Sequence, residues 1–157
     1  MKVLVTGHRG FIGTVMVPIL LDEGFDVVGL DTDLYRYCTY GDTPLAIPTI
    51  DKDVRDVEAK DLEGIDAIVH LAALSNDPLG NINADLTYDI NYKASVRLAE
   101  LAKEVGAISA DHLMAINEDG INALSTSDTI ATLLPGTTFF LNKKNYANGR
   151  KLIDNNC

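Results

Sequence analysis

The sequence predicts a doubly wound α/β fold, in which a parallel sheet of strand order 3-2-1-4-5-6 carries helices on both faces and so forms three layers. Three observations predict this fold. Short apolar segments alternate with longer segments of helical period along the 157 residues. Glycines at positions 7, 10 and 13 follow the first apolar segment, where a strand would lead into a helix. Asp31 ends the second apolar segment.

Local patterns place the first elements of the chain. Residues 2–7 and 26–31 are apolar and predict two strands, and residues 11–23 between them predict a helix. Pro18 should kink or shorten this helix, because proline lacks the N–H of a helical hydrogen bond. Gly24 is suited to end it, because glycine readily takes the left-handed conformation at a helix C-terminus.

A long irregular loop separates the second strand from the third. Residues 32–48 are rich in tyrosine, glycine and proline, and a loop of this length inside a compact domain often contacts a ligand. Residues 49–53 predict a short third strand, residues 57–62 a weak helix and residues 67–72 a fourth strand. Residues 82–105 predict a long helix, because apolar residues recur there at helical spacing.

The last part of the chain continues the alternation. Residues 108–113 predict a fifth strand, residues 118–125 a helix and residues 129–134 a sixth strand. Residues 143–155 predict a closing helix, whose apolar stripe would consist of Tyr146, Ala147, Leu152 and Ile153.

Composition restricts the partners and the compartment. The net charge of −10 argues against nucleic acid and against an acidic membrane surface as partners. No apolar run is long enough to span a membrane and the start does not have the pattern of a secretion signal, so we expect a cytoplasmic protein. Cys38 and Cys157 are too few for a disulfide framework, and we expect reduced thiols. Composition leaves the oligomeric state open.

The glycine-rich turn (residues 7–13) predicts a dinucleotide site. Glycines at such a turn permit a tight bend, close approach of a pyrophosphate and close packing of helix on strand. The helix N-terminus that follows would offer N–H groups and a positive dipole end to the phosphates. Asp31 lies where an acidic side chain binds a ribose 2′-hydroxyl, which favours NAD over NADP. The spacing is G-x-x-G-x-x-G, and a purely structural strand-to-helix turn is the alternative.

Five motifs in order extend this interpretation, namely Thr6-Gly7-His8-Arg9-Gly10-Phe11-Ile12-Gly13, Asp31, Asp53-Val54-Arg55-Asp56, His70-Leu71-Ala72-Ala73 and a helix beginning near Asp89-Ile90-Asn91. With them, residues 1–107 resemble the extended short-chain dehydrogenases, the NAD-dependent epimerases and dehydratases of nucleotide sugars. The resemblance implies a Rossmann-like part that binds NAD, without a metal, through Gly7, Arg9, Gly10, Phe11, Ile12, Gly13, Asp31, Asp53, Val54, Leu71, Ala72 and Ala73. Alternatively, Asp53 caps a turn and His70 is a hydrogen-bonded core histidine.

The catalytic pattern of that family is incomplete in this sequence. The resemblance implies a Ser or Thr on the next strand and a Tyr-x-x-x-Lys motif on a later helix, where the lysine lowers the pKa of the tyrosine. Tyr146 is followed four residues later by Arg150, and an arginine is not equivalent to a lysine. We therefore expect no functional pair, and interpret Tyr146 as a core contact of the last helix.

Residues 108–157 resemble a different family. Ile108-Ser109-Ala110-Asp111-His112-Leu113 and the segment from Thr129 to Leu141 resemble imidazolonepropionase, a metal-dependent amidohydrolase with a TIM-barrel fold. His112 matches an active-site histidine of that family. The metal there needs a His-x-His pair with a further His and an Asp, whereas this chain has only His8, His70 and His112. We therefore expect no metal site, with His112 as a bystander.

The two resemblances together predict an engineered chimera, joined near Ala107 into a single Rossmann-like domain. The charge balance changes at this point, because residues 1–107 carry a net charge of −9 and residues 108–157 a net charge of −1. We expect a scaffold that is not an enzyme and retains weak NAD binding. The alternatives are an oxidoreductase or isomerase of the epimerase/dehydratase type and, less favoured, a metal-dependent amidohydrolase.

Overall fold

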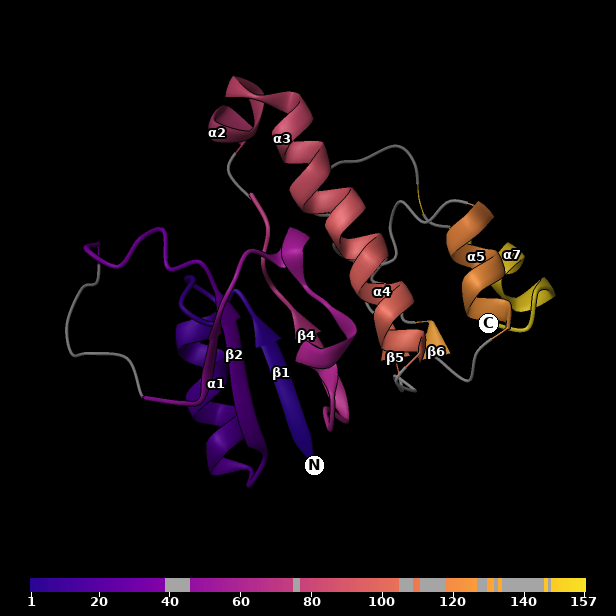
Figure 1. The fold of residues 1–157 in the computed structure, drawn as a ribbon. Coiled ribbons are helices and arrows are strands. Elements are labelled where there is room, and N and C mark those ends of the chain that lie inside the picture. Colours follow the sequence, from indigo (N-terminus) through magenta and orange to yellow (C-terminus); the bar gives the residue numbers. More distant parts are fainter. Residues whose placement is uncertain are drawn as a thin grey trace. The chain divides into compact units, whose positions relative to one another are not determined.

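The computed structural model describes residues 1–38, 46–74, 77–104, 109–110, 118–126, 130–131, 133, 146 and 148–157 (Figure 1). The chain divides into two compact units, Met1–Val105 and Gly106–Cys157. Each unit is described by itself, and the predicted union of both in one domain stays a prediction.

The first unit is built on a four-stranded parallel sheet of order β3-β2-β1-β4. Its strands are β1 (Lys2–Thr6), β2 (Asp26–Asp31), β3 (Thr49–Asp51) and β4 (Ala67–His70). Thr6 at the end of β1 pairs with Leu30 on one side and His70 on the other. The carboxyl ends of the three strands therefore meet at one edge, where parallel α/β sheets bind their ligands.

Both faces of this sheet are buried, because side chains alternate along β1. Val3 and Val5 pack with Val17 of α1 (Gly13–Asp22). Leu4, between them, packs on the opposite face with Leu98 of α4 (Ala94–Glu104). Figure 1 shows α1 and α4 on opposite sides of the strands. The predicted parallel α/β fold in three layers is confirmed for this unit.

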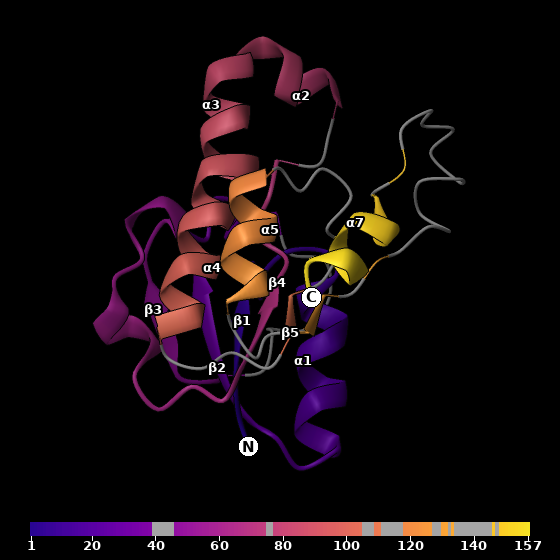
Figure 2. The same cartoon turned by 90° about the vertical axis from the view of Figure 1, so that its right-hand side faces the viewer.

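The helix predicted over residues 82–105 consists of several segments. They are α2 (Asp77–Ile82), α3 (Ala84–Tyr88), a π-helical turn η3 (Asp89–Lys93) and α4. Asn83 separates α2 from α3, because its side-chain oxygen accepts a hydrogen bond from the Leu86 amide and caps α3. Figure 2 shows α3 and α4 following one another along a common axis. The continuous helix was therefore predicted correctly from Ala84 onward, apart from the π-helical turn.

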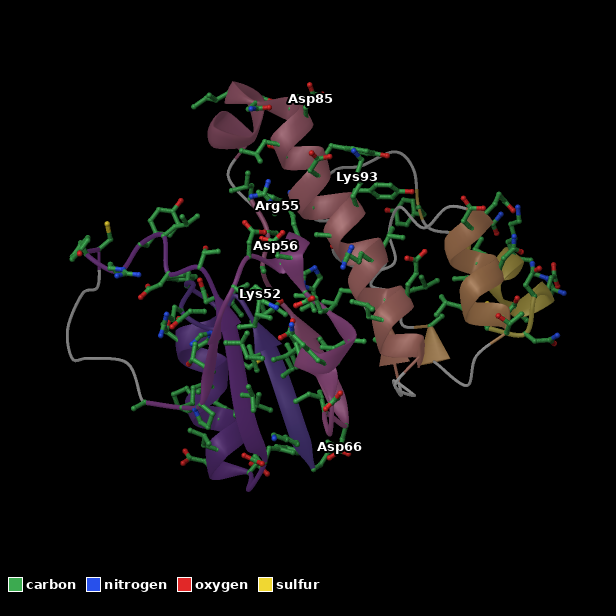
Figure 3. All side chains as sticks on the ribbon, viewed as in Figure 1. Lys52, Arg55, Asp56, Asp66, Asp85 and Lys93 are labelled. Carbon is green, nitrogen blue, oxygen red and sulfur yellow. The ribbon has the colours of Figure 1, made fainter. Side chains whose placement is uncertain are left out.

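Two short 3-10 helices connect β3 to β4 in place of the predicted weak helix. They are η1 (Val54–Asp56) and η2 (Ala59–Leu62). Lys52, labelled in Figure 3, holds η2 by pairing with Glu58 at 3.0 Å and with Asp61 at 2.6 Å. The apolar side chains of Val54, Val57 and Leu62 are buried in the core on the α4 side of the sheet.

The second unit contains β5 (Ser109–Ala110), α5 (Glu118–Ser125), β6 (Ile130–Ala131) and α7 (Gly149–Asp154). Among its described residues, Ile121, Leu124 and Leu152 form a buried cluster. β5 pairs with β6 in a parallel two-stranded sheet. The predicted six-stranded order is therefore not confirmed, because the sheet of the first unit ends at β4 over the described residues.

The last helix is shorter than the predicted 143–155. It begins at Gly149, where the Asn148 side chain accepts a hydrogen bond from the Lys151 amide. Tyr146 is 51% exposed and precedes this helix, so its interpretation as a core contact is wrong. Ile153 is 65% exposed, and Leu152 supplies the buried contact. His112 lies outside the described residues. Among the helices that the structure describes, none has the length and apolar character needed to cross a membrane.

Candidate cofactor site

The glycine-rich turn (residues 7–13) leads from β1 into α1, and Gly7 makes its first bend. Gly7 has a φ of +70°, which glycine adopts without strain. Its amide donates to the Leu30 carbonyl at 2.8 Å and fixes the turn against β2. A Cβ atom at Gly7 would lie 2.8 Å from the amide nitrogen of Ala72, which follows β4. Only glycine therefore allows this approach between the turn and the end of β4.

Gly13 allows the helix to begin directly against the turn. A Cβ atom there would lie 2.5 Å from the Gly7 carbonyl oxygen and from the Cα of His8. The helix has no side-chain cap, since Ile12 at its N-cap position has no polar side chain. Phe11 and Ile12 are 94% and 57% exposed, so the outer side of the turn faces solvent.

Asp31 lies beside this turn at the carboxyl end of β2, as the sequence predicted. One carboxylate oxygen accepts from the Arg9 amide at 2.9 Å, and the other accepts from the Asp33 amide at 2.8 Å. The side chain of Asp31 is 15% exposed. Two backbone donors thus orient the carboxylate while leaving it lone pairs for a further hydroxyl donor.

His8 lies beneath this carboxylate, and sequence reasoning gave it no role. Its ring packs on Gly29 of β2, where a Cβ atom would lie 2.5 Å from the ring. The Thr49 hydroxyl donates to the Ile47 carbonyl at 3.0 Å, so it accepts from Nε2 of His8 at 3.3 Å. Nδ1 then carries a lone pair 3.9 Å from the Asp31 carboxylate and has no hydrogen-bond partner within the described part of the chain. Burial lowers the pKa of His8. A glycine within a buried strand was the one available signal of this packing.

The backbone after β4 is fixed through the Thr6 hydroxyl. This oxygen accepts from the amides of Leu71 and Ala72 at 3.1 and 3.2 Å, so its proton goes to Nδ1 of His70 at 2.7 Å. Nε2 of His70 consequently donates to the Ser95 hydroxyl at 2.9 Å. Both ring nitrogens of His70 are hydrogen-bonded, as its alternative interpretation required, but the residue is exposed and does not belong to the core.

The same backbone is clamped farther along by Asn91 of the π-helical turn. The Asn91 side chain accepts from the Leu74 amide at 2.8 Å and donates to the Leu74 carbonyl at 2.9 Å. π-helical turns often occur at functional sites. Thr6 of β1 and Asn91 of η3 thus position residues 71–74, and Ser95 of α4 holds His70 just before them. Local sequence patterns could not identify them, because these contacts join residues far apart in the chain.

Asp53 and Val54 lie after β3, away from the glycine-rich turn. The Asp53 carboxylate accepts from the Arg55 amide at 2.9 Å and from its guanidinium at 2.8 and 3.0 Å. These bonds lower the pKa of the Asp53 carboxyl. The alternative that Asp53 caps a turn is therefore confirmed, and its cofactor role stays a prediction. Val54 is 5% exposed, so its side chain belongs to the core and only its backbone could contact a ligand.

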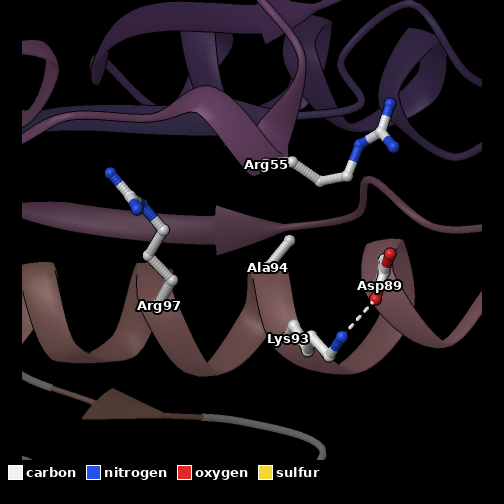
Figure 4. A pocket seen from close by; sticks show the side chains of 5 residues that line it. All are labelled: Arg55, Asp89, Lys93, Ala94 and Arg97. Carbon is white, nitrogen blue, oxygen red and sulfur yellow. Dashed lines mark ion pairs between the residues drawn. The ribbon is translucent and has the colours of Figure 1, made fainter.

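A cavity of about 250 Å³ opens between η1 and the helix containing η3 and α4. Its lining residues, drawn in Figure 4, are Arg55, Asp89, Lys93, Ala94 and Arg97. Lys93 pairs with Asp89 at 2.7 Å, and Arg97 donates to the Val57 carbonyl at 3.1 Å. None of the residues predicted to bind the cofactor lines this cavity.

No group of three metal-binding side chains occurs among the residues that the structure describes. His8 and His70 both bind hydroxyl groups, as described above. The predicted cofactor residues fall into three groups. Residues 7–13 and Asp31 form one contiguous surface, Leu71 to Ala73 adjoin it through Thr6, and Asp53 with Val54 lie beyond β3.

Comparison with solved structures reveals relatives of the same fold. The UDP-N-acetylglucosamine 4-epimerase of Methanobrevibacter ruminantium, in complex with UDP-N-acetylmuramic acid, is 26% identical with a TM-score of 0.61, over 70% of this chain and 36% of its own. The UDP-glucose 4-epimerase of Thermus thermophilus, in complex with NAD, is 25% identical with a TM-score of 0.61, over 75% and 41%. The dTDP-glucose 4,6-dehydratase DesIV of Streptomyces venezuelae, with NAD and TYD bound, is 28% identical with a TM-score of 0.57, over 75% and 42%.

A second similarity comes from curated proteins. Imidazolonepropionase of Bacillus cytotoxicus is 46% identical over 98 residues, which are 62% of this chain and 18% of that protein. The corresponding protein of Bacillus thuringiensis is 45% identical over the same length. The chain thus spans less than a fifth of these curated relatives. Both resemblances inferred from the sequence are confirmed, but the match to imidazolonepropionase spans 98 residues and so extends beyond the predicted residues 108–157.

The comparisons also correct one prediction. We expected a protein that is not an enzyme, because the Tyr-x-x-x-Lys motif is missing. The model of the NAD dependent epimerase/dehydratase family matches residues 3–123, and the solved relatives are enzymes. One absent motif does not outweigh a match that includes the whole glycine-rich turn, the four-stranded sheet and the helices around it. This chain belongs to the NAD dependent epimerase/dehydratase family.

Proposed function

We propose that this chain supplies the NAD-binding unit of an epimerase or dehydratase that acts on a nucleotide sugar. One observation carries the proposal. Two positions of the glycine-rich turn, Gly7 and Gly13, have no space for a Cβ atom, and the carboxylate of Asp31 is oriented beside them. A turn that only joined a strand to a helix would not need an oriented acidic side chain at the same edge.

The start of α1 fits a pyrophosphate. No side chain caps this helix, and the amides of Thr14 and Val15 already donate to the carbonyls of Gly10 and Ile12. The amides of residues 11–13, at the turn itself, would therefore bind the phosphate oxygens, assisted by the positive end of the helix dipole. Gly10 leaves the backbone of the turn uncovered by a side chain at this point.

The adenosine end of NAD would lie over the ends of β2 and β3. Asp31 would accept hydrogen bonds from the ribose hydroxyls, and its charge would disfavour a 2′-phosphate. The backbone around Asp53 and Val54 would lie beside the adenine. Because the exposed Phe11 and Ile12 leave the outer side of the turn open to water, we propose weak binding carried by the adenosine and pyrophosphate contacts.

The nicotinamide end would approach residues 71–73. NAD, when bound, supplies the hydride acceptor of this family's chemistry. The chain's own contribution is positioning, since Thr6 and Asn91 fix the backbone that would border this end. The nucleotide-sugar part of the proposal is supported by the uridine and thymidine nucleotides named with the solved relatives.

Titration of the full chain with NAD by calorimetry tests the proposal. We expect one site per chain and a large loss of affinity in Asp31→Ala. Asp22→Ala is the matched control, because Asp22 is an exposed acid at the far end of α1. A ligand at a hundred times its dissociation constant stabilises by about 2.7 kcal/mol, which would raise Tm by several degrees. No binding and no shift at millimolar NAD would refute the proposal, and equal affinity of Asp31→Ala would refute the ribose assignment.

We also propose that the chain is a chimera, with parts related to two families. The similarity to imidazolonepropionase supports it, because that family is unrelated to the epimerases, and so does the boundary between the compact units at Val105. Hydrogen exchange on the full chain can locate the junction. A step in protection at this boundary is expected, and uniform protection across it would count against the proposal.

A further inference from the structure

We propose that Asp33 and Asp51 set the preference for NAD over NADP by holding the guanidinium of Arg9. The inference rests on the proposed NAD site and assigns to it two residues that the sequence did not single out. It starts from Arg9, which belongs to the glycine-rich turn and whose amide donates to Asp31 at 2.9 Å. The side chain of Arg9 therefore starts beside the carboxylate that would bind the ribose.

Two carboxylates form ion pairs with this arginine. Nη1 of Arg9 lies 3.0 Å from Oδ1 of Asp51 and 3.3 Å from Oδ2 of Asp33. Asp51 ends β3, and Asp33 follows β2 in a left-handed backbone conformation with φ of +53°. A single nitrogen thus joins the ends of two neighbouring strands. The Arg9 side chain keeps 30% exposure, so it borders the proposed ribose position without being enclosed.

The balance of charge around this position is negative. Three carboxylates, those of Asp31, Asp33 and Asp51, face Arg9 and the more distant Arg36, which lies 3.9 Å from Asp33. An arginine near the ribose is the usual means of accepting a 2′-phosphate. Arg9 is close enough for that role, but its Nη1 is already bound. Asp31 would therefore repel the phosphate. Asp33 and Asp51 would keep the guanidinium of Arg9 away from the phosphate, where its charge could otherwise offset this repulsion.

This arrangement makes a prediction that differs from a site governed by Asp31 alone. Neutralising Asp33 and Asp51 should release Arg9 and admit NADP even though Asp31 is retained. Asparagine is a suitable replacement at both positions. It has the shape of aspartate and tolerates the left-handed conformation of residue 33, and Asp51 is 77% exposed.

The experiment measures the dissociation constants of NAD and NADP for the full chain and its variants at low salt. We expect Asp33→Asn/Asp51→Asn to bind NADP roughly tenfold more tightly, as for one released guanidinium beside a phosphate in an exposed site. NAD affinity should change less than about twofold, because NAD carries no phosphate at this position. The gain should shrink in high salt. Asp51→Asn alone, which alters only an exposed side chain, should give about a threefold gain.

Two further variants separate the outcomes. Arg9→Met in the double variant should abolish the gain for NADP, because the released cation is then absent. Asp22→Asn, which removes the same charge at the far end of α1, should leave both affinities unchanged. If the unmodified chain binds NAD and the double variant gains nothing, or keeps its gain without Arg9, the role of Asp33 and Asp51 is refuted while the NAD site stands. If the unmodified chain binds no NAD, the proposed function fails, and this inference fails with it.

Discussion

The two compact units of this chain show how differently α/β segments can be stabilised. In the first unit, β1 is covered on both faces, so Val3, Leu4 and Val5 are each at most 3% exposed. In the described part of the second unit, a buried cluster of Ile121, Leu124 and Leu152 is bordered by side chains that are partly exposed, namely Ala131, Leu133 and Cys157. Burial on both faces fixes the register and the ends of strands, and thus the position of any site built there. The candidate site lies in the first unit for this reason.

The largest loss of stability is expected when a buried leucine of either unit is replaced by alanine. Leu4→Ala should destabilise the first unit by about 3–5 kcal/mol, because Leu4 is fully buried within a large core that cannot close the cavity. Leu152→Ala in the second unit should cost less, about 2 kcal/mol, because the partly exposed Leu133 and Cys157 pack against its cluster and can move into the space. Hydrogen exchange resolved by residue would measure both. If the amides of the two units had equal protection and lost it together in either variant, the predicted single domain would be right and the contrast between units would be wrong.

Substitution of two glycines in the first unit should give losses of stability of intermediate size. Gly7 and Gly24 both have a positive φ, of +70° and +83°, so alanine is strained at either. A Cβ atom at Gly7 would lie 2.8 Å from the backbone of Ala72, whereas nothing lies within 4 Å at Gly24. Gly24→Ala should cost about 1 kcal/mol from strain alone, and Gly7→Ala about 1–3 kcal/mol more. Only Gly7→Ala should weaken NAD binding.

Urea denaturation with calorimetric titration of both glycine variants would check this. Equal losses of stability at the two positions would show that close packing against the end of β4 is unimportant. A Gly7→Ala variant with unchanged affinity for NAD would remove the turn from the proposed site.

A smaller effect is expected from the protonation of His8. Burial places the pKa of His8 below its ordinary value of 6.5 in the folded chain, so the unfolded chain binds the proton more readily. The contribution of neutral His8 to stability is therefore complete above pH 6.5. It is lost as the pH falls from there toward the lowered pKa of the folded state.

The measurement compares the free energy of unfolding of the chain with that of His8→Gln between pH 5 and pH 8. Because partial desolvation by the surrounding protein also lowers the pKa of His70, which keeps part of its surface exposed, the difference between the two proteins isolates His8. The advantage of the unmodified chain should decrease toward pH 5. An advantage that grew on acidification would mean that protonated His8 is stabilised by Asp31 more than burial disfavours it.

The sequence indicated the local parts of the site, and the structure added the contacts between distant parts. The glycine-rich turn and Asp31 follow from residue type and spacing, because each has a backbone or charge requirement that is visible locally. The packing of His8 on Gly29 and the bonds of Thr6 and Asn91 could not be predicted. They depend on strand register and on the π-helical turn, neither of which leaves a periodic pattern.

The same difference explains the errors outside the site. Strands of the first unit were predicted almost to their ends, and in β1 and β2 the apolar runs coincide with buried positions. Of the strands predicted over residues 108–113 and 129–134, the structure describes Ser109–Ala110 and Ile130–Ala131 as strand. The other predicted positions, apart from residue 133, lie outside the described residues. Tyr146 was assigned to a core from helical spacing, whereas α7 begins only at Gly149.

Mapping NAD on the full chain by amide chemical shifts tests the central claim most directly. If NAD binds where the first unit presents its strand ends, the shifts should concentrate in residues 7–13 and at Asp31, with smaller changes at residues 71–73. The amides of the second unit should not respond. Saturable shifts centred anywhere else, such as the cavity beside Ala94, or spectra unchanged at millimolar NAD, would contradict the account.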